Sequence, residues 1–282
     1  MPRGTVSLDV ISEAWTFLKP NIGNWILAMV AYFGASYAIS AVRGIFQMLG
    51  QNGGSQIWTI LALLLQVVSW GVTQLLLGGL AKMAIGTVRT RVANINEMWT
   101  VTNVWLGLLL SAILQGLLYL VACLPGIVVL GVSVVAPLIK SGVFNVVAQG
   151  TGKMPPVPPS MVGAMLGGIS IGVLLLILLS IPLASLLFLT TCLIVDRKIG
   201  PWEAISTSFG ALKKHFWSAV LLTFMLGLVN MAGALACCIG MLVSIPLTQI
   251  AVALIYRDLF GMGEAAPQAT VYAPPPIANP NF

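Results

Sequence analysis

The sequence has few charged residues. Only 7% of its 282 residues are Asp, Glu, Lys or Arg, whereas 59% are apolar and the mean hydropathy is +1.02. A soluble domain carries about a quarter charged residues, because its surface must face water. Thirteen basic and seven acidic side chains cannot cover a globule of this length. A soluble globular fold is therefore excluded, and we expect lipid to surround most of the surface.

The residue types of catalytic and metal sites are also scarce. His215 is the single histidine, the four cysteines form no CxxC pair, and the seven acids fall in or beside the polar connecting segments. Enzymes place paired titratable groups over a pocket, so we predict no enzyme and no catalytic, cofactor-binding or metal-binding residue. A nucleic-acid partner would need a clustered basic patch, which the sequence lacks.

Apolar stretches dominate the chain. They lie at 24–46, 57–88, 103–123, 125–142, 160–178, 181–196, 216–236 and 239–259. About 20 residues cross a hydrocarbon core of about 30 Å. The two longest runs, 104–140 and 160–196, each contain a proline near the middle, Pro125 and Pro182, and proline disrupts a helix.

We therefore predict an all-α polytopic transmembrane bundle of repeated hairpins over residues 1–261, with eight apolar segments. Six or seven full spans, or a re-entrant hairpin at 160–196, remain the alternatives. The remaining residues, 262–282, are rich in Pro and Ala and have no apolar periodicity. We predict that they form a disordered cytoplasmic tail.

The basic residues indicate the topology. With eight segments, twelve of the thirteen Lys and Arg residues fall on the side of the two termini, and only Arg43 lies near the other side. Lys and Arg accumulate in cytoplasmic loops of membrane proteins. Reading 160–196 alone as one span would carry the basic linker after it across the membrane. We therefore place both termini in the cytoplasm, in a multipass protein of a bacterial inner membrane.

A short motif occurs twice. The pattern I-x-E-x-W-T stands at residues 11–16 and again at 95–100, and PWEAISTSFGALKKHF at 201–216 is a looser third copy. Their apolar residues follow steps of three and four, which is typical of an amphipathic helix. Such a helix lies in the headgroup zone with its aromatic residues at the acyl boundary. We predict short interfacial helices near 7–19, 88–102 and 201–214, each preceding a hairpin.

The linker sequence resembles a known family. IVDRKIGPWEAISTS, residues 194–208, is similar to the D-x-x-x-G-x-x-E-A-(I/L)-x-x-S signature of a superfamily of prokaryotic multipass integral membrane proteins of unknown function. One branch of that superfamily is the membrane domain found on some glycerophosphodiester phosphodiesterases. The resemblance is best over 190–261, weaker over 5–140, and absent over 143–180. It implies a fold of about six passes and no activity, because no phosphodiesterase domain is present.

The leading functional hypothesis is a non-enzymatic membrane protein that organises lipid, including anionic lipid, or binds an unknown membrane or cytoplasmic protein. The oligomeric state stays open. Candidate contacts to a headgroup or partner are the basic and aromatic residues of the third motif and its flanks: Arg197, Lys198, Lys213, Lys214, Trp202 and Phe209. We expect the four basic residues to form one cluster.

Two alternatives remain. One is a permease or channel-like pathway for an uncharged or lipidic substrate, with a polar lumen lined by Gln66, Gln115 and Gln249. The other is a membrane-embedded enzyme, with a pocket that joins Glu97, Glu203 and His215. No cofactor is implied by either reading.

Overall fold

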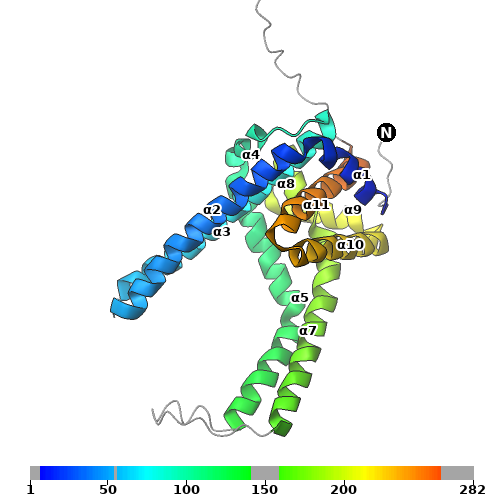
Figure 1. Cartoon of the computed structure of the whole chain (residues 1–282). Helices are drawn as coiled ribbons and strands as arrows, with labels where there is room; N and C mark the ends of the chain where they lie inside the picture. Colours follow the sequence, from blue (N-terminus) through cyan, green and yellow to red (C-terminus); the bar gives the residue numbers. More distant parts are fainter. Residues whose placement is uncertain (1–6, 54–55, 141–158, 262–282) are drawn as a thin grey trace, which may run out of the picture.

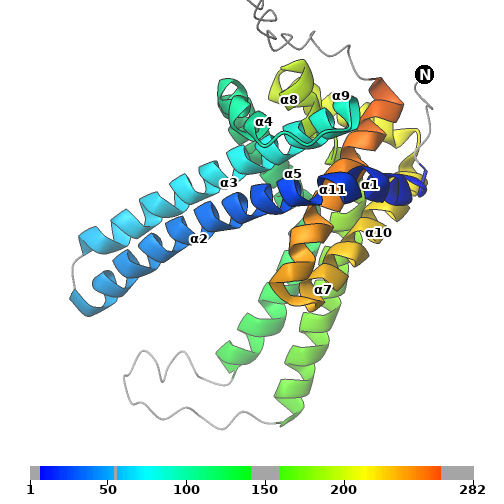
Figure 2. The ribbon, with the colours of Figure 1, turned by 45° about the horizontal axis from the view of Figure 1, so that its top comes forward.

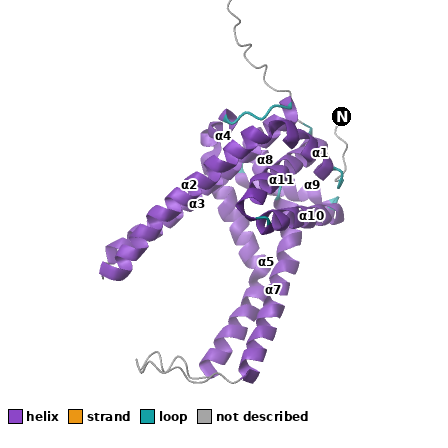
Figure 3. Ribbon diagram, viewed as in Figure 1, coloured by secondary structure: helices purple, strands orange, loops and turns teal. Residues whose placement is uncertain are grey.

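The computed structural model describes residues 7–53, 56–140 and 159–261, and every regular element in these ranges is a helix (Figures 1 and 3). Four helices are short or lie at connections: α1 (Val10–Leu18), α4 (Asn96–Trp99), α8 (Thr190–Arg197) and α9 (Pro201–Lys213). Two 3₁₀ turns, η1 (Lys19–Asn21) and η2 (Thr100–Val104), continue α1 and α4. The long helices are α2 (Ile22–Gly53), α3 (Gln56–Thr90), α5 (Trp105–Lys140), α7 (Pro159–Leu187), α10 (Phe216–Leu235) and α11 (Cys237–Phe260).

These six long helices are long and apolar enough to cross a membrane, and they make the chain a multipass membrane protein. The prediction of eight segments is wrong, and the six-span alternative is supported. Helix α5 runs without a break through Pro125, and α7 runs through Pro182. Lipid offers no partner to a freed backbone group, so a turn at mid-membrane would leave several polar groups unpaired. A proline in this setting bends the helix and does not end it.

When residues 104–140 and 160–196 each count as one span, the number of spans stays even. The two ends of the described chain therefore remain on the same side. The eight-segment reading placed 143–159 with the termini, whereas the end of α5 at Lys140 and the start of α7 at Pro159 lie away from the short helices. Residues 141–158 lie outside the described part of the chain. Helices α1, α4, α8 and α9 gather at one end of the molecule, here called the near side (Figures 1 and 2). Among the eleven described basic residues, only Arg43 and Lys140 lie toward the opposite end.

Each hairpin follows a short helix. The pairs α2–α3, α5–α7 and α10–α11 are preceded by α1, by α4 with η2, and by α9. The second of these elements is shorter than the predicted 88–102, because α3 continues to Thr90. The connection from α3 to α4 begins at Arg91, and the connection from α8 to α9 begins at Lys198. Both basic residues have a left-handed backbone, with φ 61° and φ 54°. The internal repeat itself stays a prediction.

Two of the hairpins form long arms. The α2–α3 and α5–α7 pairs leave the near side in different directions, as both views show (Figures 1 and 2). Helix α5 has 36 residues and no charged residue before Lys140, so its lipid-facing surface is about 50 Å long at 1.5 Å per residue. A hydrocarbon core is about 30 Å thick. Tilting, bending at Pro125 and Pro137, or local thickening of the bilayer would keep this surface out of water.

Ion pairs on the near side tie distant helices together. Arg89 Nη2, near the end of α3, lies 3.0 Å from Asp196 Oδ1 of α8. The hydroxyl of Tyr256, on α11, donates to the other Asp196 oxygen at 2.8 Å. Arg257 pairs with Glu13 of α1 at 2.9 Å and with Asp258 at 2.8 Å. These contacts join α1 and α3, which belong to the first hairpin and the helix before it, to α8 and α11. They also fix the end of α8, just before α9 begins.

Candidate functional site

Helix α9 is fixed to the protein by one face. Pro201 occupies its first turn after Gly200 in an extended conformation, where the missing N–H costs no hydrogen bond. Ala204, Ser208 and Leu212 are fully buried. The Ser208 hydroxyl donates to the carbonyl of Leu186 at 2.8 Å, which is one of the last carbonyls of α7 and has no partner within its own helix. This hydrogen bond sets α9 against the end of α7.

The aromatic residues of α9 lie at the exposed edge of its apolar stripe. Trp202 is 65% exposed and Phe209 is 42% exposed, whereas Ile205 and Leu212 are buried. Steps of three and four still place these four residues on one stripe of α9, but only the edge that holds Ile205 and Leu212 is buried and its aromatic edge faces outward. Seven residues separate Trp202 from Phe209, which is about two helical turns and places them on one outward face. Trp15 of α1 is similarly exposed at 46%, as expected for aromatic residues at the level of the headgroups.

The four candidate basic residues do not form one cluster. Lys198 precedes α9, whereas Lys213 and Lys214 follow each other at its other end, about 20 Å away along a helix of 13 residues. Arg197 is occupied, because its Nη2 donates to the Phe260 carbonyl at 3.1 Å and its guanidinium lies 5.1 Å from the centre of that ring. Lys213 and Lys214 are exposed.

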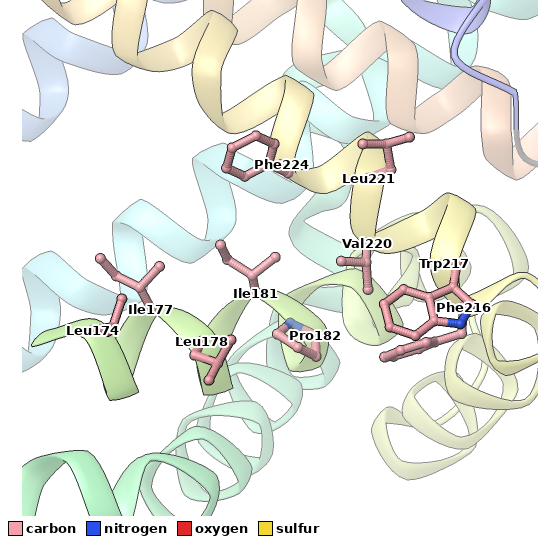
Figure 4. A pocket seen from close by; sticks show the side chains of 10 residues that line it. All are labelled: Leu174, Ile177, Leu178, Ile181, Pro182, Phe216, Trp217, Val220, Leu221 and Phe224. Carbon is pink, nitrogen blue, oxygen red and sulfur yellow. The ribbon is translucent and has the colours of Figure 1, made fainter. Parts of the chain in front are cut away.

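A groove opens between α7 and α10, beyond the lysine end of α9 (Figure 4). Its volume is about 620 Å³. The ten lining residues are all apolar: Leu174, Ile177, Leu178, Ile181 and Pro182 of α7, and Phe216, Trp217, Val220, Leu221 and Phe224 of α10. Steps of three and four place each set on a single helix face. The two faces therefore enclose the groove as opposite walls.

The groove begins on the near side, where α9 meets α10, and follows α10 away from α9. Phe216 and Trp217 start α10 and meet edge to face, with ring centres 5.3 Å apart. Trp217 is 80% exposed. Phe224, at the deeper end, is eight residues further along, or about 12 Å. The groove therefore extends about 12 Å along α10 from the end next to α9.

One wall of the groove contains a proline. Pro182 lies inside α7 and lines the groove, and it lacks the N–H that would bond to the carbonyl of Leu178 one turn earlier. The Pro182 carbonyl accepts a hydrogen bond from Ser185 at 2.7 Å. The helix is therefore locally weakened where it borders α10.

A smaller groove lies between α2 and α11. It measures about 290 Å³ and is lined by Val30, Phe33, Gly34, Tyr37, Met241 and Leu242. The α10–α11 hairpin thus has an apolar groove on each side. Only the groove at α7 has exposed lysines next to its opening.

The residues of the two alternative functions are dispersed. Gln66, Gln115 and Gln249 belong to α3, α5 and α11, and none of them lines either groove. Glu203 and His215 stand at opposite ends of α9, about 18 Å apart along the helix. The Glu97 carboxylate packs over Gly86 of α3 instead. Within the described ranges no group of three His, Cys, Asp or Glu residues could hold a metal ion.

The sequence pattern indicates Lys213 and Lys214 but not the groove beside them. Pro182 and the pair Phe216–Trp217 were the available signals, and they stand 34 residues apart along the chain. Only the packing of α10 against α7 brings them together. The resemblance of the linker to a membrane-protein superfamily stays a prediction, because comparison with family models, curated proteins and solved structures finds no match to this chain.

Proposed function

We propose that the chain is a non-enzymatic membrane protein that organises lipid by holding an acyl chain between α7 and α10. The observation that carries the proposal is the groove of about 620 Å³ with ten apolar lining residues. Sites for small molecules have volumes of about 300–1,000 Å³. A polar substrate would find only the indole N–H of Trp217 as a hydrogen-bonding group along these walls, whereas an acyl chain needs none.

The binding energy would come from packing. Lipid tails are as apolar as leucine, so no hydrophobic driving force distinguishes the groove from the surrounding bilayer. Dispersion contacts with fixed walls on two sides can still hold a chain longer than mobile neighbouring lipids do. The lining residue Trp217 is exposed beside the opening, so a lipid could enter sideways from the membrane.

The near side is proposed to face the cytoplasm of a bacterium. Nine of the eleven described basic residues lie there, and the positive-inside bias favours the cytoplasmic side for such an end. The lipid would then belong to the cytoplasmic leaflet.

Native mass spectrometry of gently extracted protein tests the proposal. Leu221 lines the groove, and Leu228 lies seven residues further on the same helix outside it. We expect bound lipid on the wild-type protein, much less on Leu221→Trp because the larger ring fills the groove, and an unchanged amount on Leu228→Trp. Equal lipid on both variants, or no lipid on the wild type, would contradict the proposal.

A further inference from the structure

We propose that the groove between α7 and α10 selects an anionic phospholipid, whose phosphate lies at Lys213 and Lys214 while one acyl chain occupies the groove. This inference rests on the proposed function and names the lipid class. It combines two neighbouring features of the structure. These are the exposed lysine pair and the apolar groove that starts beside it.

The lysines stand where a headgroup would be. Lys213 ends α9, and Phe216, the first groove residue of α10, follows three positions later. A lysine side chain can reach the headgroup level while its stem stays on apolar surface. A lipid with its chain against Phe216 and Trp217 would therefore hold its phosphate within reach of both ammonium groups.

The local charge is not neutralised. Lys213 and Lys214 are exposed and take part in none of the ion pairs of the described chain. The acid of α9 is Glu203, about 15 Å away along the helix. Two positive charges thus remain available for a lipid, and an anionic headgroup complements them where a zwitterionic one does not.

Lys213 and Lys214 adjoin the groove, whereas two other exposed lysines of the near side do not. Lys198 lies at the opposite end of α9, and Lys19 begins η1 after α1. Both are exposed, yet neither adjoins the α7–α10 groove. Substituting Lys19 and Lys198 is therefore the control, because it removes the same amount of positive charge elsewhere on the near side.

Fluorescence quenching of Trp217 by brominated lipid tests the inference. Full-length protein is placed in mixed vesicles of phosphatidylcholine and phosphatidylglycerol, and only one of the two lipids carries bromine near the carbonyl end of its chains. The Trp217 signal is the difference between the wild type and Trp217→Phe. We expect preferential quenching by brominated phosphatidylglycerol, with an enrichment of up to about 30-fold, since a basic residue near an anionic surface contributes about 1 kcal/mol and 1.36 kcal/mol is a factor of ten.

The variants distinguish selectivity for anionic lipid from the binding of any lipid in the groove. Lys213→Gln with Lys214→Gln should abolish the preference while quenching persists, and Lys19→Gln with Lys198→Gln should retain it. Equal quenching by both lipids in the wild type would overturn the anionic selectivity. Loss of the preference in the control variant would also overturn it, because bulk charge would then be the cause. No Trp217 quenching by either lipid would overturn the proposed function itself.

Discussion

Glycine allows α5 and α7 to pack closely, and one substitution tests that packing. A methyl group built on Gly172 would lie 2.5 Å from Leu130 Cγ and 3.1 Å from the backbone nitrogen of the same residue. Contacts this short are repulsive, so the helices must separate or Leu130 must change its rotamer. Gly167 lies on the same helix and has nothing within 4 Å of such a methyl group. We therefore compare Gly172→Ala with Gly167→Ala.

The magnitude follows from the difference between the two variants. Each replaces a helical glycine by alanine, which favours the helix by up to about 1 kcal/mol. That gain is common to both and cancels in the comparison. Overpacking costs typically about 1–3 kcal/mol, so Gly172→Ala should be less stable than Gly167→Ala by about that amount.

Unfolding of the purified protein by sodium dodecyl sulfate measures this difference. We expect the unfolding midpoint of Gly172→Ala to fall and that of Gly167→Ala to stay at or above the wild-type value. Equal midpoints for the two variants would refute the close approach of α5 and α7 at this level.

Two further predictions concern topology and the near-side ion pairs. In a background without native cysteine, Ile139→Cys at the far end of α5 and Ser206→Cys on α9 should be labelled from opposite sides of the membrane, and labelling from the same side would restore the eight-segment reading. Arg89→Gln should lower the unfolding free energy by about 1–2 kcal/mol, because it leaves the half-buried Asp196 without its cation. Arg91→Gln, which removes only a stacked and exposed guanidinium, should cost less in the same unfolding assay, and equal losses would argue against the ion pair.

The sequence predicted the helices well and their continuity poorly. The motif copies at 11–16 and 95–100 coincide with α1 and with α4 and η2, because helical periodicity is a local property. Pro125 and Pro182 misled the span count, since the effect of a proline depends on whether water can satisfy the backbone groups that it frees. Inside lipid the helix continues.

The candidate site depended on packing that no local pattern records. The outward position of Trp202 follows from the burial of the adjoining face of α9, which holds Ala204, Ser208 and Leu212 and is bonded to the end of α7. The separation of Lys198 from Lys213 could have been read from the length of the helix. The groove could not, because its walls come from two spans whose facing surfaces are set by tertiary contacts.

The most direct test of the account is whether lipid stays in the α7–α10 groove after the bilayer is removed. A photoreactive amino acid replaces Leu178, which lines the groove, or Leu166, which is equally lipid-facing on α7 outside it. The protein is exchanged into detergent, irradiated and analysed by mass spectrometry for lipid adducts. We predict a phospholipid adduct at position 178 and none at 166. Adducts at both positions in equal amount, or at neither, would contradict the assignment of this groove as a lipid site.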